Sequence, residues 1–137
     1  MKVNSARCFI LLSLPLALSG CILGYPLQVA VGSAGVVATA RKQAPDCLRS
    51  IHVFERPASK RQAQIGPDAP PIWTLEAVEG RCVTGFPTLR YGQVADGMVE
   101  AAPAPALIPG RTYWLRGYTP GAIYSGEFIA PGPSPGS

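Results

Sequence analysis

The sequence predicts a small antiparallel β-sandwich, and three observations support this fold class. After residue 46, six or seven short runs rich in β-branched and aromatic residues alternate with turn residues, at spacings near ten residues. No convincing amphipathic helical pattern lies between these runs. The chain contains 15 prolines and 15 glycines, which supply turns and protected strand edges and disfavour a helical bundle.

The first 20 residues have the layout of a signal peptide. The segment MKVNSAR carries Lys2 and Arg7 and no acidic residue, and an apolar core of 11 residues follows from Cys8 to Leu18. Because a helix that spans a bilayer needs about 20 apolar residues, this core is too short for a permanent span. We therefore predict that residues 1–20 are a signal peptide.

The segment Leu18-Ser19-Gly20-Cys21 resembles the lipobox of bacterial lipoproteins. That motif has Leu three positions before an invariant cysteine, whose thiol takes a thioether-linked diacylglycerol. The resemblance implies that Cys21 carries lipid and that acyl chains hold the protein in a membrane. An Asp after the cysteine commonly marks retention in the inner membrane, so Ile22 implies the outer membrane, with the domain facing the periplasm. The alternative is an ordinary cysteine behind an ordinary secretory signal.

Residues 21–45 are predicted to be a lipidated tether, which is mostly apolar up to Arg41 and Lys42. One interpretation is a strand in LQVAV, a Gly-Ser-Ala-Gly turn and a second apolar run, which pack on the domain or stay weakly ordered. The other is a partly helical segment at the membrane surface. We favour the first interpretation, because Gly32 and Gly35 would each weaken a helix by about 1 kcal/mol.

Residues 46–130 are predicted to form the sandwich. CLRSIHVFE is a strand with Ile51 and Val53 on one face, and it ends at Pro57. The stretch ASKRQAQIGPDAPP is a polar loop. The runs IWTLEAVEG and RCVTGF are expected to pair as a hairpin around Gly80. TLRYGQV is a further strand, which precedes an Asp-Gly turn and the extended, proline-rich connection AAPAPALIPG.

The runs RTYWLRGYT and AIYSGEFIA are predicted to form a late hairpin. Strand alternation puts Tyr113, Leu115 and Ile123 on one face and Trp114 on the other. Residues 131–137, with the sequence PGPSPGS, are predicted to be a disordered tail.

The stretch LRYGQVADGMVEAAPAPALIPGRTYWLRGY resembles a segment of small uncharacterised Gram-negative lipoproteins, in which a YG-x-[VP]-x-G stretch precedes L-x-PG-x-x-Y. The resemblance covers about residues 86–130. The PG-x-x-Y element also recurs in immunoglobulin-like and fibronectin-like domains, where the Pro-Gly pair sets a turn and the Tyr packs at a sheet corner. The resemblance therefore implies an immunoglobulin-like sandwich. Its motifs concern turns and leave the function open.

Two cysteines remain once Cys8 leaves with the signal peptide and Cys21 carries lipid. In an oxidising periplasm Cys47 and Cys82 are predicted to form a disulfide, with two buried free thiols as the alternative. The bond would close a loop of about 36 residues and contribute about 4 kcal/mol in the chain-entropy model. Two cysteines and the distant His52 fall short of the four ligands of structural zinc, so we expect no metal.

No catalytic motif is apparent, so we predict a non-enzymatic protein without a cofactor. The chain has no Gly-x-Ser-x-Gly elbow and no phosphate-binding glycine pattern. The single histidine, His52, falls on the polar face of a strand, where an ordinary histidine is commoner than a general base. Glu76, Glu79, Asp96 and Glu100 flank predicted turns and are interpreted as solvated turn residues.

Aromatic residues are the remaining candidates for binding. Trp114, Tyr118 and Tyr124 are predicted to form a surface that stacks on a glycan or a peptide, with core packing as the alternative. Removal of Lys2 and Arg7 leaves 10 basic against 8 acidic residues, a balance that disfavours nucleic acid as a partner.

These inferences predict a lipid-anchored binding or structural module of the envelope. Its expected partners are the membrane, through acyl chains on Cys21, and an envelope protein or a glycan. Two alternatives stay open: an accessory subunit of an envelope or secretion assembly, and a membrane-tethered enzyme without a recognisable motif.

Overall fold

The structure of this protein is a computed structural model, and it describes residues 23–40, 47–79 and 81–133. Regular structure in these residues is almost entirely β, which confirms the predicted all-β class. The strands are β1 (Leu23–Gly32), β2 (Gly35–Ala40), β3 (Ser50–Glu55), β4 (Trp73–Ala77), β5 (Leu89–Arg90), β6 (Met98–Glu100), β7 (Thr112–Thr119) and β8 (Ala122–Ile129). The signal peptide, Cys21 and residues 134–137 lie outside the described residues.

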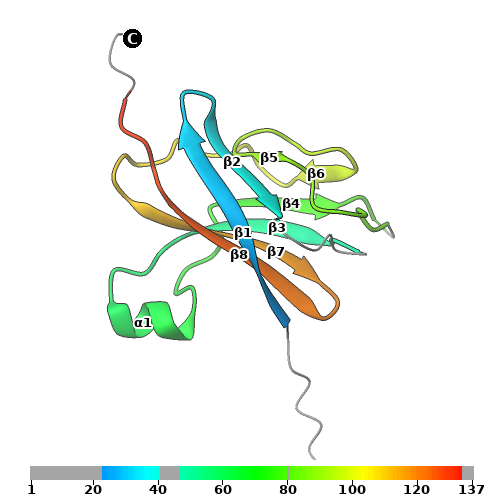
Figure 1. Cartoon of the computed structure of the whole chain (residues 1–137), viewed down its shortest axis with the longest axis horizontal. Coiled ribbons are helices and arrows are strands. Elements are labelled where there is room, and N and C mark those ends of the chain that lie inside the picture. The colour runs from blue at the N-terminus through cyan, green and yellow to red at the C-terminus, as the bar shows by residue number, and fades with distance from the viewer. Residues whose placement is uncertain (1–22, 41–46, 80, 134–137) are drawn as a thin grey trace, which may run out of the picture.

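The strands form one mixed sheet in the order β5-β2-β1-β8-β7-β3-β4-β6. This sheet curls into a half-barrel around the core (Figure 1). The immunoglobulin-like antiparallel sandwich is not confirmed. Strand β1 pairs in parallel with β8 over Leu23–Pro26 and antiparallel with β2 over Leu27–Gly32. It therefore joins strands β5 and β2 to the remaining strands of the sheet.

Residues 23–40 belong to the sheet, so the predicted tether over residues 21–45 is wrong for this stretch. Strands β1 and β2 form a hairpin around residues 33–34, as the first of the two interpretations proposed. Leu27, Val36 and Ala38 are buried in the core. The domain therefore includes two strands that precede its predicted start at residue 46, because alternate side chains of this apolar stretch have a core to enter.

The core lies on the concave side of the half-barrel. Ile51, Val53, Tyr113 and Leu115 are each at most 2% exposed, which confirms the predicted faces of β3 and of β7. The placement of Ile123 with Tyr113 and Leu115 is wrong. Ile123 pairs with Tyr118, and this register turns it to the convex side of the sheet.

The polar stretch predicted as a loop contains the helix α1 (Lys60–Ile65). The Ser59 side chain accepts a hydrogen bond from the backbone N–H of Gln62 at 3.4 Å, which caps the first turn. The helix buries none of its own residues. The described residues contain no helix with the length and apolar character needed to cross a membrane.

The hairpin predicted from IWTLEAVEG and RCVTGF is not formed. Strand β4 pairs with β3 and β6, whereas RCVTGF contributes only an isolated bridge between Val83 and Leu48. The Asp-Gly turn lies where it was predicted. Gly97 has a φ of +78° and the N–H of Met98 donates to the carbonyl of Ala95 at 3.1 Å, so the chain reverses just before β6.

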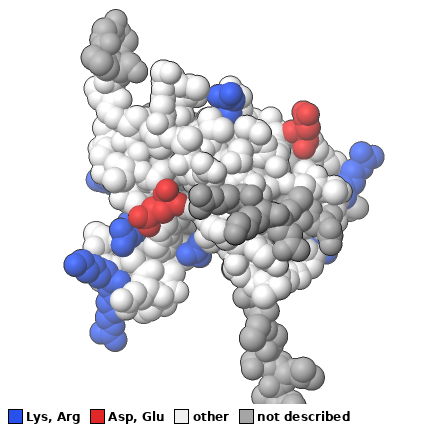
Figure 2. All heavy atoms as spheres, in the orientation of Figure 1, with Lys and Arg blue, Asp and Glu red and all other residues white. Residues whose placement is uncertain are grey.

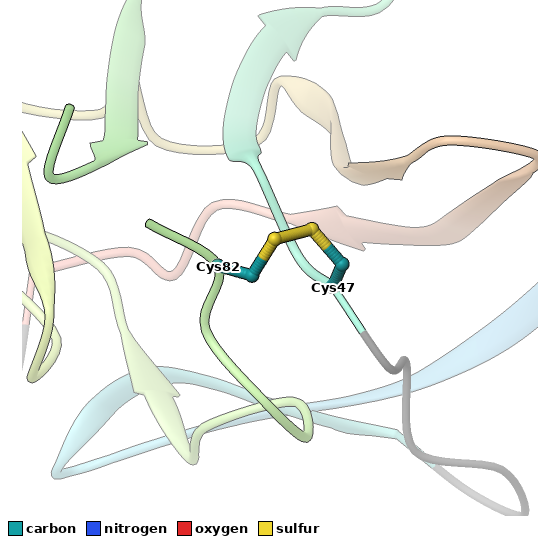
Figure 3. The surroundings of a disulfide bond; sticks show 2 residues. All are labelled: Cys47 and Cys82. Carbon is teal, nitrogen blue, oxygen red and sulfur yellow. A yellow bond between two sulfur atoms is a disulfide. The ribbon is translucent and has the colours of Figure 1, made fainter. Parts of the chain in front are cut away.

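A disulfide joins Cys47 and Cys82, as predicted (Figure 3). Cys47 lies just before β3, and Cys82 lies in the irregular segment after β4. The next residues along each segment, Leu48 and Val83, exchange two backbone hydrogen bonds of 2.9 and 3.1 Å. The disulfide therefore holds the segment around Cys82, for which the described residues show no strand pairing other than the bridge between Leu48 and Val83.

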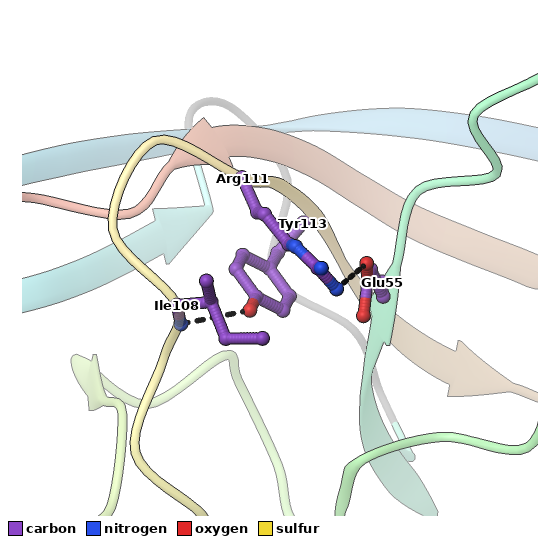
Figure 4. Close-up of polar contacts among 4 residues, drawn as sticks. All are labelled: Glu55, Ile108, Arg111 and Tyr113. Carbon is purple, nitrogen blue, oxygen red and sulfur yellow. Dashed lines mark hydrogen bonds and ion pairs between the residues drawn. The ribbon is translucent and has the colours of Figure 1, made fainter.

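The PG-x-x-Y element forms the turn that leads into β7. Gly110 has a φ of +79°, and the N–H of Arg111 donates to the carbonyl of Ile108 at 3.2 Å. The hydroxyl of Tyr113 accepts a hydrogen bond from the N–H of Ile108 at 3.0 Å, and Arg111 pairs with Glu55 at 2.6 Å (Figure 4). The tyrosine thus buries its ring and holds the turn against β7 with its hydroxyl.

Candidate functional site

The convex side of β3 and β7 carries a continuous group of large side chains. The two strands are antiparallel, and their register places Phe54 opposite Trp114 and His52 opposite Arg116. Phe54 is buried by its neighbours, and the other members are half-buried. We call this group the aromatic face: His52, Phe54, Trp114, Arg116 and Tyr118.

Arg116 lies over two rings of the aromatic face. Its Cζ atom is 4.9 Å from the ring centroid of Trp114 and 6.0 Å from that of Phe54, which are cation–π distances. Among the described residues the ion pairs are Arg56–Glu127 and Arg111–Glu55, so Arg116 has no carboxylate partner there. A guanidinium stacked in this way keeps its planar edge available for a carboxylate or a phosphate.

Trp114 is oriented by a hydrogen bond from its indole nitrogen. The Nε1 atom donates to Oε2 of Glu127 at 2.9 Å, and Glu127 also lies 3.8 Å from Arg56. A shallow pocket beside this contact is lined by Trp114, Arg116, Ser125, Gly126 and Glu127. The pocket combines an aromatic ring, a cation and an acceptor at the surface of the sheet.

His52 lies between the two ends of the aromatic face. Its ring centroid is 4.9 Å from that of Tyr118 and 5.8 Å from that of Phe54. Burial lowers the pKa of His52 below its ordinary value of 6.5, and the negative charge of Glu76 raises it by a smaller amount. His52 is therefore neutral at pH 7, and Arg116 supplies the positive charge of the face.

Across residues 23–40, 47–79 and 81–133, no group of three or more His, Cys, Asp or Glu side chains could hold a metal ion. Glu100, interpreted as a solvated turn residue, instead lies in β6 and accepts a hydrogen bond from Trp73 at 2.9 Å. The carboxylate of Glu100 therefore holds the indole of Trp73 in place.

Two of the three predicted binding residues belong to the aromatic face. Trp114 and Tyr118 lie on the convex side, but Tyr124 is 2% exposed and its ring stacks on that of Tyr25 at 5.1 Å between centroids. The prediction for Tyr124 is wrong because this residue pairs with Gly117, which faces the core.

Arg116, His52 and Phe54 were not among the residues predicted to bind a partner. Strand alternation contains a signal for Arg116, because it shares a face with Trp114 and Tyr118. Alternation likewise places His52 and Phe54 on the face opposite Ile51 and Val53, but their position beside Trp114 and Arg116 depends on the register between two strands far apart in the sequence.

Comparisons with protein-family models, with curated proteins and with solved structures gave no match to this chain.

Proposed function

We propose that this protein is a lipid-anchored lipoprotein of the outer membrane that faces the periplasm and acts as a non-enzymatic binding module. Lipid on Cys21 would supply the anchor, as the lipobox resemblance implies. The aromatic face would bind the partner. The observation that carries this second part is the position of Arg116, which stacks on Trp114 at an accessible sheet surface without a carboxylate partner among the described residues.

The composition of the aromatic face favours binding over simple solvation. The concave side of the same strands already forms the core, so small polar side chains would suffice on the convex side. Instead, this side concentrates Trp, Tyr and Arg, the residue types that dominate binding energy at interfaces. These residues support a role in recognition.

The charge of the face indicates the chemistry of its partner. With His52 neutral, Arg116 favours an anionic group, and the rings of Trp114 and Tyr118 favour a flat apolar surface. An acidic glycan or an acidic segment of an envelope protein offers both. We therefore propose a carboxylate-bearing envelope partner.

Photo-cross-linking in intact envelopes tests the binding role. A photoreactive amino acid replaces Ser125, which lines the pocket beside Trp114. We expect a dominant adduct that is lost in Arg116→Gln and in Trp114→Ala. Val99→Ala is the control, because Val99 is 52% exposed on β6 at the edge of the sheet. An adduct pattern that is the same in all three variants would refute the binding role of the aromatic face.

Titration with soluble peptidoglycan fragments separates the two kinds of partner. If the partner is a glycan, these fragments change the fluorescence of Trp114, and Arg116→Gln weakens the response. If the partner is a protein, the fragments have no effect and the cross-linked adduct contains a second polypeptide.

The anchor is tested at Cys21. Cys21→Ser is expected to shift the protein from the membrane to a soluble form or an unprocessed precursor, since only a thiol takes the lipid. Unchanged mass and unchanged membrane extraction would contradict lipidation.

A further inference from the structure

The start of β1 lies beside the turn between β7 and β8. Leu23 pairs in parallel with Ala122, and its N–H donates to the carbonyl of Gly121 at 3.1 Å. One residue, Ile22, separates Leu23 from Cys21 in the sequence. Cys21 is thus only two residues before the first residue of β1 in the sequence. Lipid on Cys21 would therefore hold this end of the domain at the bilayer.

The anchored end belongs to one edge of the molecule. In the view of Figure 1 the start of β1, the β7–β8 turn and helix α1 form the lower edge. The turn between β1 and β2 lies at the upper edge, where residues 131–133 (red) also lie. Leu23 is 56% exposed at the lower edge.

Helix α1 has the composition of a membrane-surface contact. It buries none of its residues, and Ile65 is 74% exposed. Lys60 and Arg61 are exposed on the same short helix, and Figure 2 shows Lys and Arg side chains gathered over α1 at the lower left. An apolar side chain with adjacent cations fits the interface of a bilayer, where the apolar group enters the head-group region and the cations approach lipid phosphates.

We propose that the lower edge rests on the membrane surface, with Ile65 in the head-group region and Lys60 and Arg61 against anionic lipid phosphates. This inference rests on the proposed lipidation of Cys21. An acylated residue at one point leaves the domain free to tilt, and α1 supplies the second contact that fixes its orientation. Strand β7 then approaches the membrane with Tyr118 nearest and Trp114 farther away, so a partner reaches the aromatic face from the periplasmic side.

Fluorescence quenching in vesicles tests this orientation. The full-length lipidated protein is placed in vesicles of phosphatidylethanolamine and phosphatidylglycerol that contain a lipid with a nitroxide on its head group. A fluorophore is attached at Ile65→Cys or, as the matched position at the opposite edge, at Ser33→Cys. We expect strong quenching at residue 65 and little at residue 33.

Charge reversal supplies the second arm of the experiment. Lys60→Glu combined with Arg61→Glu should weaken the quenching at residue 65, because each cation at an anionic surface changes the ratio of contacting to tilted molecules by about fivefold. Arg90→Glu is the control, since exposed Arg90 lies on β5 at the other edge of the sheet and should leave the quenching unchanged.

The outcomes distinguish the anchor from the orientation. Protein that does not float with the vesicles overturns lipidation and this inference together. Protein that floats, but whose fluorophore is quenched equally at residues 33 and 65 or is insensitive to the charge reversal, overturns the orientation alone.

Discussion

The indole Nε1 of Trp73 donates to Oε2 of Glu100 at 2.9 Å, so a buried ring of β4 is fixed to β6 across 27 residues of sequence. Glu100→Ala would leave this N–H without its partner. We expect the free energy of unfolding to fall by about 1–3 kcal/mol, measured by urea denaturation. Glu100→Gln is the control, because it keeps an acceptor oxygen and should lose less. Equal stability of both variants and the parent protein would show that water replaces the carboxylate.

The two faces of β7 predict opposite effects for neighbouring residues. Leu115 is 1% exposed, so Leu115→Ala should lower the free energy of unfolding by about 2–5 kcal/mol. Trp114→Ala removes a half-buried ring from the convex side and should cost about 1 kcal/mol or less, while it weakens partner binding. Thermal denaturation of both variants checks this contrast, and the reverse order of stability would contradict the assignment of the faces.

Gly117 leaves the space that Phe86 fills against β7. A Cβ atom at residue 117 would lie 2.7 Å from Cε2 of Phe86 and 3.2 Å from Cδ1 of Leu48. Gly117→Ala should therefore lower the free energy of unfolding by about 1–3 kcal/mol, as overpacked cores do. Gly24→Ala is a control on another strand, because its Cβ would meet nothing within 4 Å. Equal midpoints of chemical denaturation for the two variants would argue against a close contact at Gly117.

The disulfide between Cys47 and Cys82 limits the unfolded chain. Replacement of both residues by Ala should lower the free energy of unfolding by about 4 kcal/mol in the chain-entropy model. The comparison is made by chemical denaturation without a reductant, and then with one. Reductant should destabilise the parent protein and leave the double variant unchanged. A parent protein that is insensitive to reductant under unfolding conditions would contradict this account.

The position of His52 makes stability depend on pH. Because burial lowers its pKa in the folded state, the unfolded chain binds a proton near pH 6.5 that the folded chain still excludes. Stability should therefore fall as the pH drops from 6.5 to the lowered pKa of the folded state, and recover as the pH rises. Denaturation of the parent and of His52→Gln across this range isolates the effect. A difference in the free energy of unfolding between the parent and His52→Gln that stays the same at every pH would refute the role of His52.

Local alternation predicted the parts of the fold that depend on neighbouring residues. Tyr113 and Leu115 face inward because every second residue of β7 does, and β7 and β8 are joined by a short Pro-Gly turn. The pairing of Cys47 with Cys82 followed from the small number of cysteines. These features need no knowledge of distant strands.

Pairings between distant segments could not be predicted in this way. Strand β6 has three residues, too few to show a period, yet it displaces the expected hairpin partner of β4. The burial of Tyr124 depends on the register that pairs it with Gly117, and the aromatic face depends on the register of His52 with Arg116. Each of these depends on strand register, which a single sequence does not specify.

The parallel pairing of β1 with β8 has a consequence for how the domain acquires its fold. Strand β1 hydrogen-bonds to β8, so the chain must close a loop of about 100 residues before Leu23 meets Ala122. Contacts so distant in sequence slow folding, because the entropy of loop closure is lost before the contact is gained. A nascent chain that lacks residues 122–129 can form the β1–β2 hairpin but has no β8 for the start of β1 to pair with. The domain therefore completes its sheet only after synthesis of its last strand, and it stays open until then.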